Sequence, residues 1–94
     1  MTTAVQEALD LDVRWALHPQ VALRPESFGA LLYHFGTRKL SFLKNRTIVA
    51  IITSLPDHPD MRSAIAAAGV PESGMAPYIK AFATLADSSM ITKL

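Results

Sequence analysis

The hydrophobic pattern of this chain changes its period between residues 21 and 55, and this change limits the folds that the chain can adopt. Residues 28–35 are mostly apolar at both alternating positions, as expected of a strand that is covered on both faces. Residues 39–43 alternate between polar and apolar side chains, as in a strand with one face in solvent. After Asn45 the apolar residues follow a helical spacing, at Ile48, Ile51, Ile52 and Leu55. The stretch therefore predicts two strands followed by a helix.

Two turns divide the predicted strands. Gly36 lies between residues 28–35 and 39–43, and it predicts a tight hairpin because glycine takes a positive φ at little cost. Pro25 stands second in the segment Arg24–Ser27, where proline favours a turn, so the chain is expected to reverse direction there. The result is an antiparallel meander of three strands, at about residues 20–24, 28–35 and 38–43.

Three helices are expected after the meander. The first begins with Asn45 as its N-cap and ends before Pro56. The second runs from near Pro59 to Gly69, and the third begins near Ser73. The order of elements predicts an α+β, winged-helix-like fold in which a three-stranded antiparallel sheet is followed by three helices.

The length of 94 residues is enough for one domain. Residues 1–13 are small, polar and weakly patterned, so we expect a flexible arm there and a single domain over residues 14–94. Three acidic residues among the first 12 argue against a signal peptide, and no stretch reaches the ~20 apolar residues that a membrane span needs. We therefore expect a cytoplasmic protein.

Composition and motifs give little reason to expect an enzyme. The chain has no cysteine, so it forms no disulfide and binds no cluster through thiolates. His18, His34 and His58 are far apart and lack the spacing of metal ligands. No serine lies in a G-x-S-x-G motif, and the four glycines are scattered rather than gathered in a phosphate loop. We expect no catalytic residue, no metal site and no cofactor.

Four basic residues bracket the last predicted strand: Arg38, Lys39, Lys44 and Arg46. They could be solvated charges that protect an edge strand from aggregation, contacts of a DNA-binding wing, or a surface that attracts an acidic peptide. The net charge of the whole chain is only +1, which gives no electrostatic argument for nucleic acid.

A three-stranded meander leaves an edge with unpaired backbone groups, and an extended peptide can add there as another strand. The last strand would form one wall of such a site. The third helix would form the other wall through Tyr78, Ala81, Phe82 and Leu85. The small side chain of Ala81 would let a peptide backbone approach closely, although Phe82 and Leu85, each taken alone, are more simply explained as core residues.

Two sequence runs carry a resemblance to a known family. They are LHPQVALRPE (residues 17–26) and FGALLYHFGTRKLSFL (residues 28–43), and the similarity is dense from about Trp15 to Leu55. In these runs the chain closely resembles the mycofactocin biosynthesis chaperones. These proteins belong to the PqqD-like group of precursor-peptide recognition domains, also called RiPP recognition elements.

The resemblance implies a function and a site. PqqD-like domains hold a leader peptide between the last strand and the last helix, which corresponds to Arg38–Leu43 and about Pro77–Leu85 here. The implied partners are the mycofactocin precursor peptide and a radical S-adenosylmethionine (SAM) maturase. The maturase would bind the iron–sulfur clusters and SAM. The implied peptide-binding residues are Arg38, Lys39, Leu40, Ser41, Phe42, Leu43, Tyr78, Ala81, Phe82 and Leu85.

Two alternatives remain open at this point. A winged-helix DNA-binding regulator has the same order of elements and predicts salt-sensitive duplex binding that is lost on substitution of Arg38 or Arg46. A homodimer that pairs exposed strand edges or swaps its hairpin is compatible with the high apolar content. Binding of a peptide along the last strand instead predicts that a Ser41→Pro change disrupts it by removing a backbone donor.

Overall fold

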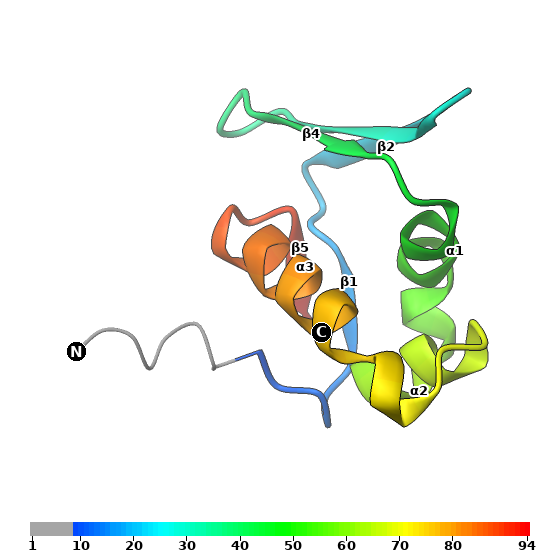
Figure 1. Cartoon of the computed structure of the whole chain (residues 1–94). Coiled ribbons are helices and arrows are strands. Elements are labelled where there is room, and N and C mark those ends of the chain that lie inside the picture. The colour runs from blue at the N-terminus through cyan, green and yellow to red at the C-terminus, as the bar shows by residue number, and fades with distance from the viewer. Residues whose placement is uncertain (1–8) are drawn as a thin grey trace.

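The computed structural model describes residues 9–94, which form two small sheets and three helices (Figure 1). One antiparallel sheet has the strand order β2-β3-β4, and a second sheet pairs β1 with β5. The strands are β1 (Trp15–Leu17), β2 (Val21–Glu26), β3 (Gly29–His34), β4 (Leu40–Leu43) and β5 (Ile91–Lys93). The helices are α1 (Arg46–Ser54), α2 (Met61–Ala67) and α3 (Ala76–Asp87), with 3₁₀ turns η2 (Leu55–Asp57) and η3 (Glu72–Gly74). The predicted α+β plan is confirmed.

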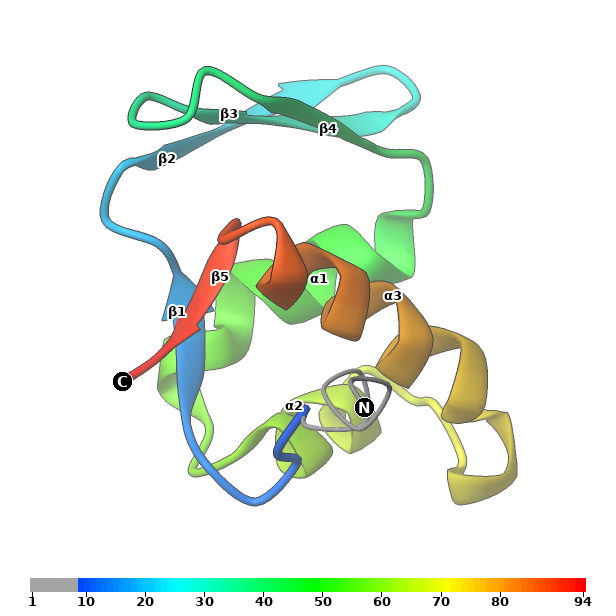
Figure 2. The same ribbon diagram turned by 90° about the vertical axis from the view of Figure 1, so that its left-hand side faces the viewer.

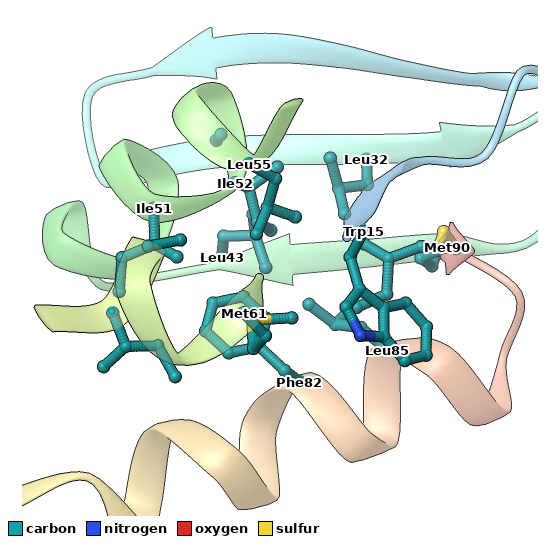
Figure 3. Close-up of a cluster of buried hydrophobic side chains, with 14 of the residues drawn as sticks. Trp15, Leu32, Leu43, Ile51, Ile52, Leu55, Met61, Phe82, Leu85 and Met90 are labelled. Carbon is teal, nitrogen blue, oxygen red and sulfur yellow. The ribbon is translucent and has the colours of Figure 1, made fainter. Parts of the chain in front are cut away.

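The β2-β3-β4 sheet forms a layer of its own above the helices (Figures 1 and 2). Its inner face, toward the helices, carries the buried side chains of Ala30, Leu32 and His34 from β3. Side chains from the helices, from β1 and from the residue just before β5 complete the core: Trp15, Ile51, Ile52, Leu55, Met61, Phe82, Leu85 and Met90 (Figure 3).

Asn45 marks the passage from the sheet to the helices. Its side-chain oxygen accepts hydrogen bonds from the backbone N–H groups of Thr47 (2.8 Å) and Ile48 (3.1 Å). This cap satisfies two of the N–H groups that the start of a helix leaves without partners. Ile51 and Ile52 are buried, so capping and burial together make a helix of a segment rich in β-branched residues.

The pairing of β1 with β5 is a feature that the sequence patterns do not predict. Trp15 lies opposite Lys93, and Leu17 lies opposite Ile91. The chain turns at the end of α3 through Ser89, which takes a φ of 62°. The last strand therefore fixes the C-terminal end of α3 against the start of the domain.

The flexible arm expected over residues 1–13 falls largely on residues 1–8, which lie outside the described part of the chain. Residues 9–13 lie against α2. The backbone N–H of Met61 donates a hydrogen bond to the carbonyl oxygen of Val13 (3.1 Å).

The first turn of the meander comes two residues later than predicted. Pro25 lies inside β2, opposite Ala30, and the chain reverses after Glu26. This is possible because β2 is an edge strand, where the missing N–H of a proline breaks no ladder. The turn depends instead on Gly29, which has a φ of +150° and whose added Cβ would collide with the carbonyl oxygen of Leu43.

The hairpin between β3 and β4 forms as predicted, but its residue with positive φ is Arg38 (65°) and not Gly36. The N–H of Arg38 donates to the carbonyl of His34 (2.7 Å), and the N–H of His34 donates to the carbonyl of Lys39 (3.0 Å). Space is restricted at Gly36, since a Cβ there would lie 2.9 Å from Cε1 of the buried His34.

Only one face of the β2-β3-β4 sheet is covered within the described part of the chain. The prediction that residues 28–35 are covered on both sides is therefore wrong: β3 alternates between buried and half-buried residues. In β4 the side in solvent is that of Leu40 (52% exposed) and Phe42 (60% exposed), while Leu43 is buried. We call the uncovered side the outer face. Its large apolar side chains are Phe28, Leu31, Tyr33, Phe35, Leu40 and Phe42, and β2 adds Ala22, Arg24 and Glu26 along one edge.

Candidate peptide-binding site

A groove with a volume of about 350 Å³ lies between β4 and α3. In both views α3 runs below β4 (Figures 1 and 2). The groove is lined by Ser41, Phe42, Leu43, Lys44, Ile48, Ala81, Thr84 and Leu85. Residues 41–44, in and just after β4, form one wall, and α3 forms the other. The first turn of α1 contributes the side chain of Ile48.

The strand that borders the groove has an open edge. β3 pairs with β4 on one side, and no strand of the described part pairs with it on the other. The carbonyl of Lys39 accepts a hydrogen bond from β3 (3.0 Å), and in an antiparallel pair the bonded residues alternate. Ser41 and Leu43 therefore bond to β3. The backbone N–H and C=O groups of Leu40 and Phe42 point to the open edge.

Five of the ten residues proposed for the site from the resemblance line this groove: Ser41, Phe42, Leu43, Ala81 and Leu85. Ser41 is half-buried and Leu43 is buried on the inner face, whereas Phe42 stands at the rim. Ala81 is half-buried, and its single methyl group leaves the space between helix and strand open. The segments 38–43 and 77–85 thus meet at one groove.

The other five residues lie elsewhere. Arg38 and Lys39 are exposed at the hairpin end of β4, and the side chain of Leu40 is on the outer face. Tyr78 is half-buried and packs against the core. Phe82 is fully buried among the core side chains (Figure 3), so it holds α3 in place from within the core.

Three groove residues are missing from the proposed set. Thr84 lies one turn after Ala81 on the same side of α3, so helical spacing alone could have identified it. Lys44 directly follows β4. Ile48 reaches the groove because α1 turns back beneath the sheet after Asn45, and no local sequence pattern gives that angle.

His34 holds the hairpin that carries β4. Its side chain is 2% exposed, and its Nδ1 accepts hydrogen bonds from the backbone N–H groups of Gly36 (3.0 Å) and Thr37 (3.1 Å). The ring also contacts that of His18, with 4.6 Å between the ring centroids. With Nδ1 as an acceptor, the neutral ring carries its proton on Nε2. The loop that leads into β4 is therefore fixed from the inside.

Positive charge gathers at both ends of β4. Arg38 and Lys39 precede the strand, and Lys44 and Arg46 follow it. Arg46 donates a hydrogen bond to the carbonyl of Ser27 (3.1 Å), and Lys44 lines the groove. The described part of the chain forms two ion pairs, Arg24 with Glu26 and Arg62 with Asp12. The four basic side chains at β4 are in neither pair, so their charge is available to a binding partner.

Comparison with protein families gives a match over residues 14–92 to the Peptide chaperone MftB family. The chain belongs to this family. The resemblance to mycofactocin biosynthesis chaperones is thereby confirmed.

Three relatives named Peptide chaperone MftB are similar to this family member over most of its length. The Mycolicibacterium smegmatis protein is 61% identical over 93 residues, which cover 97% of this chain and 91% of the relative. The Mycobacterium ulcerans protein is 67% identical over 84 residues (89% and 77%). The Mycobacterium tuberculosis protein is 62% identical over 82 residues (87% and 75%). No solved structure was found that matches this MftB family member.

Two further observations concern residues 9–94 of this MftB family member. None of its helices there has both the length and the apolar character that crossing a bilayer requires. No three side chains among its histidine, aspartate and glutamate residues in that range are grouped so that they could hold a metal ion.

Proposed function

We propose that this chain binds the mycofactocin precursor peptide in the groove between β4 and α3 and presents it to a radical SAM maturase. The observation that carries the proposal is the open edge of β4, where the backbone groups of Leu40 and Phe42 border a groove lined by α3. An extended peptide can add at such an edge as a further strand, with backbone hydrogen bonds as the common source of affinity. Membership of a peptide chaperone family supports the same function.

A peptide strand added to β4 would direct its side chains alternately to two sides. Those on the inner side would meet Ile48, Ala81 and Leu85, and those on the outer side would lie beside Leu40 and Phe42. Since both surroundings are largely apolar, the proposal favours a segment with apolar residues at successive positions. The charge of Lys44 favours an acidic residue at that end of the segment.

The proposal assigns no chemistry to this chain. The iron–sulfur clusters and SAM would belong to the maturase. The chain would act by raising the effective concentration of the peptide near the active site of its partner. The proposed location is the cytoplasm, where a ribosomally made precursor is first available.

The charges of the helices give little support to the alternative of a DNA-binding regulator. A helix that reads DNA brings basic side chains to the phosphates. The only basic residue of α2 is Arg62, which pairs with Asp12 (3.3 Å), and the only one of α3 is Lys80. We therefore expect no salt-sensitive binding in a titration with a DNA duplex.

Filling the groove tests the peptide site. In an Ala81→Trp variant the indole would occupy the space between α3 and β4, and we expect the affinity for precursor peptide, measured by isothermal titration calorimetry, to fall at least about tenfold, or about 1.4 kcal/mol. Ala66→Trp, at an exposed position of α2 away from the sheet, is the matched control and should bind as the wild type does. Unchanged affinity of Ala81→Trp would show that the peptide lies elsewhere.

A further inference from the structure

The outer face of the sheet is a contiguous apolar surface, and only its β4 edge, at Leu40 and Phe42, borders the proposed peptide site. Cross-strand pairing places Leu31 opposite Phe42 and Tyr33 opposite Leu40. Phe28 extends this block at one end, with its ring centroid 6.1 Å from that of Phe42. Phe35 extends it at the other end, edge-on to Tyr33 at 5.0 Å. The four residues with the greatest exposure on this face are 41–60% exposed, so the surface is open as well as apolar.

Basic residues border the outer face. Residues 20–46 contain five lysines and arginines and one acidic residue, Glu26, which is already paired with Arg24 (2.8 Å). Arg38 and Lys39 lie at the hairpin end of the sheet, and the remaining two basic residues lie at the opposite end. The rest of the chain carries a net negative charge, because the total for all 94 residues is only +1. The surface is thus an apolar centre with a basic rim.

The size and charge of the outer face argue against a second copy of this chain as its occupant. Three strands about 5 Å apart and about four residues long give a footprint on the order of 200–300 Å². A stable interface needs roughly 800 Å² from each partner. Two copies placed face to face would also bring two basic rims together, which is unfavourable.

We propose that the outer face docks a different protein, one that presents an apolar surface surrounded by acidic side chains. A larger partner can extend beyond the footprint of the sheet, and acidic groups on it would pair with the basic rim. We identify the docked protein as the radical SAM maturase, and this identification rests on the proposed function.

The position of β4 gives this arrangement a functional consequence. The backbone edge of β4 borders the peptide groove, while the side chains of Leu40 and Phe42 belong to the outer face. A peptide added along β4 would therefore lie beside the docked maturase. β4 would then contact both partners, the peptide through its backbone edge and the maturase through its outer side chains.

The test uses a Phe28→Ser/Phe35→Ser double variant, since both side chains are exposed and neither lines the groove. The probes are the purified maturase, with its iron–sulfur clusters in place, and the precursor peptide alone. Binding of each is measured separately by fluorescence anisotropy. We expect affinity for the maturase to fall at least tenfold and affinity for the peptide to stay within twofold of wild type. Leu94→Ser, at a still more exposed apolar residue outside the face, is the control and should bind both probes normally.

A charge reversal gives a second readout that does not depend on removing apolar groups. Arg24→Glu on β2, on the opposite edge of the sheet from β4, should weaken maturase binding at low salt, and added salt should narrow the difference from wild type. Peptide affinity should not change.

Several results would overturn the inference: a maturase that does not bind the wild-type chain, unchanged maturase affinity in the double variant, or a wild-type dimer in sedimentation that the double variant dissolves. The last result would assign the outer face to a second copy. Failure of the proposed peptide site looks different. In that case the wild-type chain does not bind the peptide, while maturase binding still depends on Phe28 and Phe35.

Discussion

Replacing Gly29 by alanine is expected to lower the free energy of unfolding by about 3 kcal/mol or more, which corresponds to a drop in Tm of roughly 12 °C or more for a domain of this size. Two causes add together. Gly29 has a φ of +150°, which an alanine rarely adopts, and the new Cβ would collide with the backbone carbonyl of Leu43. Since that carbonyl belongs to β4, the clash can be relieved only by moving the strand that borders the groove. Thermal and urea unfolding followed by circular dichroism measure the effect.

Substitutions at two other glycines distinguish the effect of the positive φ from the effect of the clash with Leu43. Gly69 has a φ of +89° but no atom lies within 4 Å of a Cβ built on it, so Gly69→Ala should cost only about 1 kcal/mol of backbone strain. Gly74 has neither a positive φ nor a close neighbour, so Gly74→Ala should be nearly neutral. Equal losses for Gly29→Ala and Gly69→Ala would contradict the role given to the contact with Leu43.

A Ser41→Pro variant is expected to lose about 3 kcal/mol of stability, because its N–H bonds to β3 and the ring would break the ladder between the two strands. The structure thus changes how a loss of peptide binding by Ser41→Pro is to be interpreted. The sequence identified Ser41 as a residue of the last strand but not the direction of its N–H. Loss of peptide binding in this variant would therefore reflect loss of the hairpin.

Leu40→Pro is the substitution that tests the open edge. The N–H of Leu40 points away from β3, so its removal should cost the free protein less than about 1 kcal/mol, as for a proline on the open side of an edge strand. The same change should weaken peptide binding about tenfold, because one backbone donor to the added strand is lost. Leu40→Ala controls for the lost side chain. Equal destabilisation by Ser41→Pro and Leu40→Pro would contradict the assigned bonding pattern.

Local signals in the sequence were enough to predict most elements of the fold. The helical spacing after Asn45 and the suitability of Asn45 as a cap correctly gave α1, despite its β-branched residues. The three strands of the meander and the approximate limits of all three helices were also correct. Each of these features depends on residues that lie close together in the chain.

Features that depend on distant contacts were missed or misplaced. The pairing of Trp15 with Lys93 joins the two ends of the domain, and neither segment carries a pattern that identifies its partner. Pro25 was taken as a turn residue because its tolerance in β2 depends on that strand lying at the edge of the sheet. Leu40 and Phe42 were predicted as peptide-binding residues, but the alternating pattern did not show that their side chains form part of an open apolar surface.

The candidate site was predictable in part. The resemblance named segments of β4 and α3, and the structure brings these two elements together at one groove. It did not separate Phe82, which is in the core, from its neighbour Ala81, which lines the groove, because adjacent helical residues differ in direction by about 100° and only packing shows which one is free. Ile48 was missed because its position depends on the angle between α1 and the sheet.

Amide hydrogen exchange along β4, with and without precursor peptide, tests the central claim most directly. In the free chain the amides of Ser41 and Leu43 should exchange slowly because they bond to β3, and those of Leu40 and Phe42 should exchange fast. Addition of saturating peptide should slow exchange at Leu40 and Phe42 by at least about tenfold, with little change at Ser41 and Leu43. Bound peptide that leaves the amides of Leu40 and Phe42 as fast as before would contradict binding at the edge of β4.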